Sequence, residues 1–241
     1  MIMKTITVLL AVICLSCTKE VYIEVPRDVI INDTVIVHDT IKLIVTGTYT
    51  EVIIGNQVWL KENLRENYLN DSTEIPIITN PSQWSKTTTP ACCFYNNDPE
   101  IEKDYGLLYN WYAVNTGKLC PVGYHVPSDD EWKELERFIG TEDVDGIQDR
   151  GRVAYKLKAK GEWDEGETDD FNITGFSAVP SKYRYNNGYF HVFYMDEAAF
   201  WTTGEFEGYR CYRALMADRD GIHRSGTYKE SGMSVRCIKN R

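Results

Sequence analysis

The chain has 241 residues, a hydrophobic fraction of 43% and a formal net charge of −10, which allows one sizeable domain with a tail, or two small domains. The acidic excess argues against nucleic acid or an anionic membrane surface as a partner, because both need a basic protein face. Aromatic residues make up 12% of the chain, and together with many glycines they favour a loop-rich fold that contains sheet.

Residues 1–16 are predicted to be a signal peptide. Lys4 supplies positive charge, and the apolar run after it is shorter than the about 20 residues that span a bilayer. The run ends in Ser16-Cys17, and a small residue directly before a cysteine resembles the bacterial lipoprotein signal. This resemblance implies cleavage before Cys17, acylation of Cys17, attachment to the lipid bilayer and location in the cell outer membrane. Cys14 is a departure from the signal, and an ordinary signal peptide is the alternative.

The acidic turn after Cys17 resembles the surface-export signal of Bacteroidetes lipoproteins, which implies exposure at the cell surface. Residues 17–45 are predicted to be an extended stalk. Within them VIINDT (29–34) is followed by VIVHDT (35–40), a six-residue period rich in β-branched residues. No helix face explains that period, so extended chain is favoured. The alternative is a pair of strands that belongs to the following domain.

The domain is predicted to span residues 46–241 and to begin with a hairpin. Two β-rich runs within residues 50–60 flank Gly55-Asn56, which predicts the turn. Prolines punctuate residues 61–100, which are predicted to be irregular. Asp104 can cap a short helix whose apolar side includes Trp111, and Gly117 can end that helix.

The clearest local pattern in the chain is the helix predicted over residues 128–139. Ser128 is a good N-cap, and Glu131 can reach back to the Ser128 N–H, which completes a capping box. Gly140 is placed to end the helix in a left-handed conformation. Four residues recur at helical spacing and predict the apolar face: Trp132, Leu135, Phe138 and Ile139.

The second half of the chain carries β signals. An Asn-Gly turn at Asn187-Gly188 lies between two tyrosine-rich runs, and Asp220-Gly221 predicts another hairpin. Further strands are predicted at residues 200–203 and 209–216, and one continuous strand at 233–238. Helices in the first half and antiparallel strands in the second indicate an α+β fold.

Several motifs resemble the Fibrobacter succinogenes major paralogous domain, a family of bacterial lipoproteins. The motifs are IGNQVWLKENLR (54–65), CFYNND (93–98), YGLLYNWYAV (105–114), LCPVGYHVPSDDEW (119–132) and GMSVRCIKN (232–240). The family in turn resembles the C-type-lectin-like fold of formylglycine-generating enzymes. The resemblance implies two main helices packed on a small irregular antiparallel sheet, with the first and last strands close together.

The resemblance also implies a disulfide between Cys120 and Cys237, because both lie in recurring motifs of the family. Rival pairings use Cys93, which also lies in such a motif. Export to an oxidising compartment permits disulfides. Five cysteines follow Cys17, so at least one thiol is left over.

No catalytic residue, metal ligand or cofactor is predicted. A copper oxidase of the formylglycine type would need two converging thiolates. The C-terminal candidates are Cys211 and Cys237. This alternative would be favoured if the two thiols faced each other across an open cleft. Asn96-Asn97-Asp98-Pro99 carries oxygen ligands suited to calcium, but the Glu-Pro-Asn or Gln-Pro-Asp loop of C-type lectins is absent. The acidic residues of 164–170 are expected to be solvated.

The expected function is that of a non-catalytic cell-envelope lipoprotein, a binding or adhesion module for a surface glycan or protein. An enzyme, either an oxidase of the formylglycine type or a hydrolase, and a structural surface scaffold are the alternatives. Aromatic residues of the second half are candidates for stacking on a ligand, although core packing is the simpler use of each: Tyr183, Tyr185, Tyr189, Phe193, Tyr194, Trp201, Tyr209, Tyr212 and Tyr228.

Overall fold

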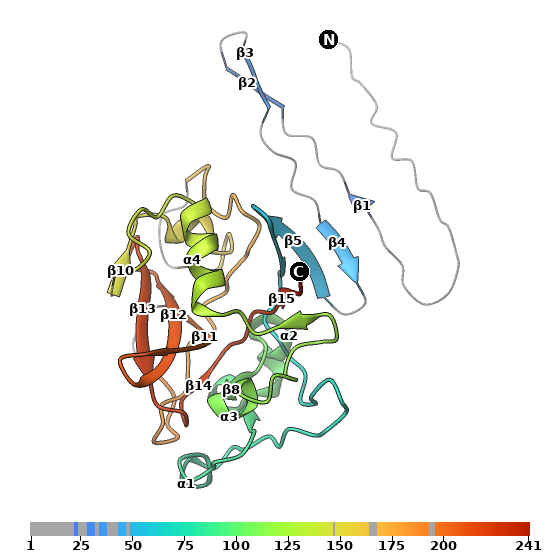
Figure 1. The fold of residues 1–241 in the computed structure, drawn as a ribbon, viewed down its shortest axis with the longest axis vertical. Helices are drawn as coiled ribbons and strands as arrows, with labels where there is room; N and C mark the ends of the chain where they lie inside the picture. The colour runs from blue at the N-terminus through green and yellow to red at the C-terminus, as the bar shows by residue number, and fades with distance from the viewer. Residues whose placement is uncertain are drawn as a thin grey trace, which may run out of the picture.

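The computed structural model describes residues 49–146, 148–163, 168–192 and 196–241, together with the backbone of four strands between Tyr22 and Thr46. One principal helix, α4, lies at one side of several small antiparallel sheets and long loops, so the fold is α+β (Figure 1). The predicted signal peptide and Cys17 lie outside the described residues. No helix in the described ranges has the length and apolarity needed to cross a bilayer.

The largest sheet of the described chain joins the two ends of the domain. Its order is β1 (Tyr22–Ile23), β4 (Leu43–Thr46), β5 (Tyr49–Ile54), β6 (Gln57–Leu60), β15 (Ile238–Lys239) and β9 (Tyr124–His125). The β5–β6 hairpin turns at Gly55-Asn56, as predicted, and Gly55 adopts a φ of 61°. Ile238 pairs with both Trp59 and His125, so the last strand lies between β6 and β9.

Strand β4 pairs with β5, so the range expected to be a stalk contributes a strand to the sheet of the domain. The two copies of the six-residue repeat form a hairpin with each other, β2 (Asp28–Ile31) with β3 (Thr34–Val37). Figure 1 shows this hairpin projecting from the body of the domain.

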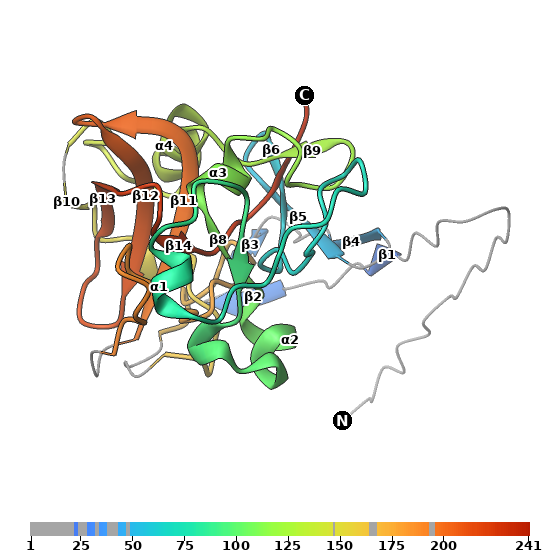
Figure 2. The same ribbon diagram turned by 90° about the horizontal axis from the view of Figure 1, so that it is seen from below.

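A second sheet carries the strands of the second half. Its order is β10 (Gln148–Arg150), β13 (Ile222–Thr227), β12 (Tyr209–Met216) and β11 (Glu197–Phe206). The turn at Asn187-Gly188 is present, but the runs beside it make isolated bridges rather than strands. A third sheet has the order β14 (Gly232–Met233), β8 (Leu108–Asn110) and β7 (Cys92–Cys93). Figure 2 shows this sheet between the other two.

The predicted continuous strand at 233–238 is wrong. Its first residue pairs with β8 and its last with β6 and β9, while Val235 and Arg236 between them belong to no strand. The chain leaves one sheet and enters another there, so the side chains of this segment are buried between sheets rather than alternating across one.

The helix α4 (Asp129–Phe138) is confirmed with its capping box. Ser128 accepts from the Glu131 N–H, and the Glu131 carboxylate accepts from the Ser128 N–H. At the other end Gly140, with a φ of 105°, donates to Arg137 and Thr141 donates to Glu136, the bonds of a Schellman motif. Phe138 does not join the apolar face as predicted: it is 60% exposed and its ring lies over the turn at Gly55.

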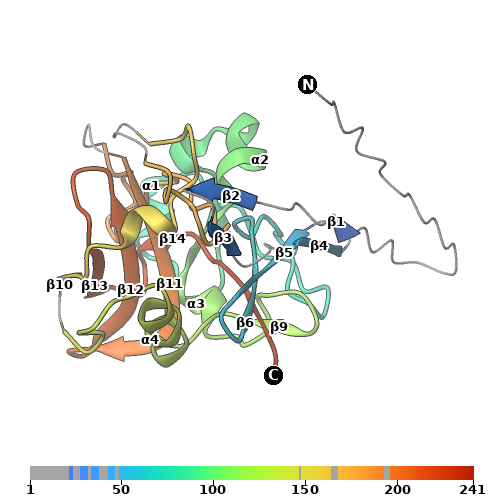
Figure 3. The same cartoon turned by 90° about the horizontal axis from the view of Figure 1, so that it is seen from above.

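The prediction of a second main helix from Asp104 to Gly117 is wrong. Gly106, with a φ of 73°, ends a single turn of helix, and Leu108–Asn110 then pair as β8. Asn110 caps another single turn through a bond from the Ala113 N–H. The remaining helices of the described chain are short: α1 (Pro81–Trp84), α2 (Glu102–Tyr105), α3 (Trp111–Val114), and the 3₁₀ turns Tyr95–Asn97, Pro99–Ile101 and Ala154–Lys156. Figure 3 shows α4 and α2 on opposite sides of the molecule.

Aromatic rings and buried charges fix α4 in place. The rings of Trp59, Trp132, Phe176 and Phe200 contact one another with centroids 5.3–5.9 Å apart. Glu136 of α4 is fully buried and forms ion pairs with Arg150 of β10 and Arg213 of β12. Removing one partner of such a buried pair leaves an uncompensated charge, so this network ties the helix to the second sheet.

Candidate functional site

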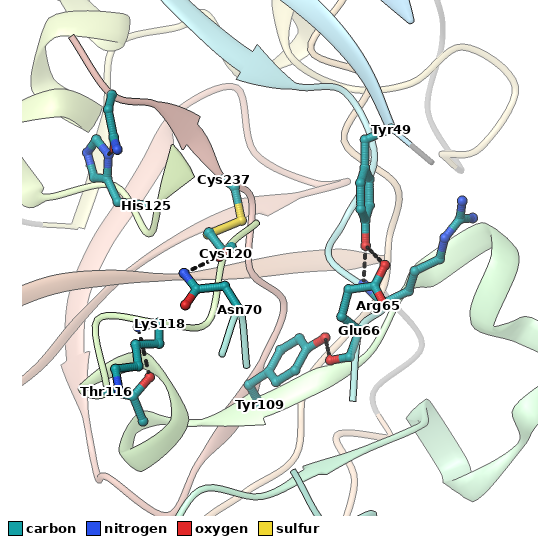
Figure 4. The surroundings of a disulfide bond; sticks show 11 residues. Tyr49, Arg65, Glu66, Asn70, Tyr109, Thr116, Lys118, Cys120, His125 and Cys237 are labelled. Atoms are coloured by element: carbon teal, nitrogen blue, oxygen red, sulfur yellow. Dashed lines mark hydrogen bonds between the residues drawn. A yellow bond between two sulfur atoms is a disulfide. The ribbon is translucent and has the colours of Figure 1, made fainter. Parts of the chain in front are cut away.

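The structure places the Sγ atoms of Cys120 and Cys237 2.02 Å apart, at the distance of a disulfide (Figure 4). This is the pairing that the family resemblance implied. It joins the loop before α4 to the residue before β15, across 117 positions of sequence. The Asn70 amide donates to the Cys120 carbonyl at 3.1 Å, which ties a third segment of chain to the bridge.

A cavity of about 320 Å³ lies beside this bridge, and Cys120 lines it. Tyr49 and Glu66 of its lining bond each other and neighbouring residues. The Tyr49 hydroxyl donates to the Glu66 carboxylate and accepts from the Arg65 N–H, and the Tyr109 hydroxyl donates to the Glu66 carbonyl (Figure 4). Because these groups satisfy one another, we assign the cavity to the packing of the loops.

The thiols are not arranged as a copper pair. Cys237 is bonded to Cys120, whereas the buried Cys211 thiol contacts Asp129 at 3.4 Å and Arg213 at 3.3 Å. Burial raises the pKa of Cys211, so its thiol is protonated at neutral pH. Cys92 and Cys93 are buried too, and burial raises the pKa of each. Unreactive protonated thiols are therefore expected at all three positions.

The predicted aromatic cluster is divided among several places. Trp201 is fully buried in the core, and Tyr183 stacks on His191 with ring centroids 4.5 Å apart. Tyr209 and Tyr228 are exposed and contact each other edge to face at 5.4 Å. Phe193 and Tyr194 lie outside the described residues, as do residues 164–167 of the acidic loop.

Two further cavities adjoin each other and are lined largely by polar and charged residues. We name the first the tyrosine cavity. It has a volume of about 350 Å³, within the range of small-ligand sites. It is lined by Tyr95, Asn96, Asp98, Ile101, Tyr105, Glu162, Pro180, Lys182 and Asp196.

We name the second the arginine cavity, of about 380 Å³. Glu162 lines both cavities, so they adjoin and are called the cleft from here on. The arginine cavity is lined by Lys61, Glu62, Asn63, Lys103, Asp104, Gly106, Ala159, Lys160, Glu162, Asn172, Ser177, Val179 and Arg236.

Backbone strain is concentrated in the cleft. Seven residues other than glycine adopt positive φ in the described chain, and four of them line the cleft: Asn96, Asn172, Ser177 and Lys182. Local bonds hold two of these in place, since the Asn172 amide donates to the Ser177 hydroxyl and the Ser177 N–H donates back to the Asn172 side chain. Left-handed residues that lack glycine's freedom cost free energy and gather at functional sites.

Tyr105 and Arg236 dominate the electrostatics of the cleft. Burial, followed by the nearby carboxylates of Glu162 and Asp196, raises the pKa of Tyr105, so its hydroxyl remains a neutral donor. Arg236 is 1% exposed, and burial lowers its pKa to about 9, so the guanidinium is still a cation at neutral pH. The cleft thus offers an aromatic ring, neutral donors, carboxylates and one buried cation.

Asn96 and Asp98, weighed above for calcium, do line the tyrosine cavity. The described residues hold no cluster of three or more histidine, cysteine or acidic side chains that could bind a metal ion. Sequence reasoning missed Tyr105, Glu162 and Arg236, which come from distant parts of the chain. The sequence offered one hint, which is that Arg236 in the motif GMSVRCIKN is a charged residue among small and apolar neighbours.

Comparison with known proteins gives one result that bears on this chain. The family model described as the Fibrobacter succinogenes major domain matches residues 52–239. No curated protein and no solved structure is similar enough to this chain to count as a match.

Proposed function

Since the chain belongs to the family of the Fibrobacter succinogenes major domain, we propose that its domain is a non-catalytic module that binds a glycan in the cleft. The observation that carries this proposal is the combination of two tyrosines with carboxylate and amide side chains in the lining of one cleft. Sugar rings present an apolar C–H face, which packs on an aromatic ring, and hydroxyl groups, which bond to carboxylates and amides.

We further propose that Cys17 is acylated and holds the protein in the outer membrane, with residues 17–45 between the lipid and a domain of residues 46–241. The short apolar run and Ser16-Cys17 support this proposal.

For the fold we infer a variant of the C-type-lectin-like fold. Two features support it: the pairing of β15 with β6 brings the last strand to the first hairpin, and one main helix packs on small antiparallel sheets. The single-turn helices α2 and α3 replace the second long helix of that expectation.

A glycan array with the full-length protein in detergent tests the proposed function. We expect binding that Tyr105→Ala weakens at least tenfold, since stacking and a hydroxyl donor are both lost. Tyr189→Ala is the matched control, because Tyr189 is 65% exposed and lines neither cavity of the cleft. Recovery of the bound glycan uncleaved separates binding from hydrolysis, and an array without a single bound glycan would contradict the proposal.

A further inference from the structure

Arg236 is a buried cation whose hydrogen bonds go only to neutral acceptors. Its Nε and Nη2 donate to the Asn63 amide oxygen, the latter at 2.7 Å, and its Nη1 donates to the Phe176 carbonyl. Its guanidinium lies over the rings of Phe176 and Phe200, at 4.3 and 5.6 Å from their centroids. These contacts use three of the five N–H groups of the guanidinium, and the other two have no acceptor among the described residues.

Other buried arginines of the described chain differ from Arg236. Arg150 and Arg213 pair with the carboxylate of Glu136. Arg184, like Arg236, donates to neutral acceptors, which are backbone carbonyls in its case, but it lines neither cavity of the cleft. Arg236 therefore combines two features: it lacks a paired carboxylate within the part of the chain that is described, and it forms part of a cavity wall.

The carboxylate with the largest electrostatic effect on Arg236 is Glu62. Its oxygen accepts from the Thr50 N–H at 2.8 Å instead. Buried charges in proteins are normally paired, because an unpaired charge is costly to remove from water. The unused N–H groups of Arg236 thus mark a place where an external anion would be stabilised.

The charges of the arginine cavity indicate how much negative charge fits there. Three lysines and Arg236 face three carboxylates, so the cavity has one cation in excess: Lys61, Lys103, Lys160 and Arg236 against Glu62, Asp104 and Glu162. One excess positive charge would be balanced by a ligand group that carries one negative charge. The planar guanidinium fork matches the two oxygens of a carboxylate.

We propose that the glycan bound in the cleft is acidic, and that the carboxylate of one sugar unit lies against Arg236 in the arginine cavity. This inference rests on the proposed function and narrows its ligand to glycans whose sugar units carry a carboxylate, such as uronic acids. Tyr105 and the tyrosine cavity then contact the neighbouring sugar units.

The test compares tetragalacturonate with its fully methyl-esterified form by titration calorimetry on the full-length protein in detergent. The two probes share every ring and differ in the charge of the carboxyl groups. We expect the acid to bind at least tenfold tighter than the ester, as a charge-assisted hydrogen bond predicts. Arg236→Gln should remove that preference in protein whose folding is verified by circular dichroism.

Lys160→Gln keeps the test decisive if Arg236→Gln does not fold, because Lys160 is exposed and lines the arginine cavity. It should reduce the preference for the acid severalfold, whereas Lys86→Gln, an exposed lysine outside the cleft, should leave it unchanged. Equal binding of acid and ester would overturn this inference while the proposed function stands, as would an array on which only neutral glycans bind. Failure to bind any glycan would overturn both.

Discussion

The indole of Trp132 is fully buried and contacts the rings of Trp59, Phe176 and Phe200, so this one side chain connects α4 to three separate segments. Ser128, the N-cap of α4, acts only on the first turn of that helix through its capping bond. We therefore expect Trp132 to contribute more than Ser128 to the free energy of unfolding.

We expect Ser128→Ala to lower the free energy of unfolding by about 1 kcal/mol, since one capping bond is lost. Trp132→Ala should lower it by about 3–5 kcal/mol, because it leaves a large cavity in the core. Chemical denaturation of the two variants checks both values. Phe138→Ala, at a largely exposed position of the same helix, is the control and should change less than Trp132→Ala; equal effects of these two substitutions would contradict the docking of α4.

Glu197 is a buried carboxyl with unusual titration. Burial raises its pKa to about 7, and the charge of Asp218 adds to this while Arg219 and Lys182 oppose it. His191 lies 3.8 Å away, beyond hydrogen-bond distance, and burial lowers its pKa, so the neutral ring does not supply a charge to Glu197 at pH 7. The folded protein thus holds a proton on Glu197 more tightly than the unfolded chain does.

This proton makes stability depend on pH. The stabilising contribution is fully present below the unfolded pKa of 4.5, decreases as the pH rises from 4.5 to about 7, and is lost above that. The loss is on the order of 3 kcal/mol, from the size of the pKa difference. Unfolding free energies from pH 4 to 8 should show this decrease relative to Glu197→Gln, which cannot titrate. Parallel curves for the two proteins would show that Glu197 has an ordinary pKa.

At the scale of elements, the cysteine bridge has the largest expected effect. It closes a loop that spans 117 positions, and the chain-entropy model assigns about 4–5 kcal/mol to a loop of that size. We expect Cys120→Ser with Cys237→Ser to lower the free energy of unfolding by up to that amount, and Cys211→Ser, which breaks no bridge, to cost less. Non-reducing peptide mapping should recover a peptide that joins Cys120 to Cys237. Free alkylated Cys120 in oxidised protein would contradict the pairing.

Elements defined by local chemistry were predictable from sequence. The capping box at Ser128 and the hairpin turn at Gly55-Asn56 need only residues close in sequence, and both are present. The helix expected from Asp104 failed because pairing of Leu108–Asn110 with strands from residues 92 and 233 overrides local helical spacing. The cleft was not predictable, because its walls come from segments near residues 63, 105, 162 and 236 that only the tertiary fold brings together.

At the scale of the whole molecule, the proposed attachment to the membrane would depend on Cys17. We expect Cys17→Ala to remain unprocessed or to be released as soluble protein, because two or three acyl chains are what give stable anchoring. Cell fractionation followed by immunoblotting measures this. Cys14→Ala is the matched control, since Cys14 lies within the predicted signal and would be removed with it. Membrane association that Cys17→Ala leaves unchanged would rule out the lipid anchor.

The disulfide between Cys120 and Cys237 closes a loop that contains some residues of the cleft and excludes others. Glu162 and Arg236 lie inside the loop, whereas Asn63, Tyr95 and Tyr105 precede it. Suppose that the protein is anchored at its N-terminus and that its ligand is attached to another surface. Tension between the two would then act first on β5, β6 and the segments after them. The bridge would keep the loop from extending while the wall that carries the tyrosines is drawn away from Arg236. If the cleft binds a glycan as proposed, we expect force to release that glycan before the second sheet unfolds.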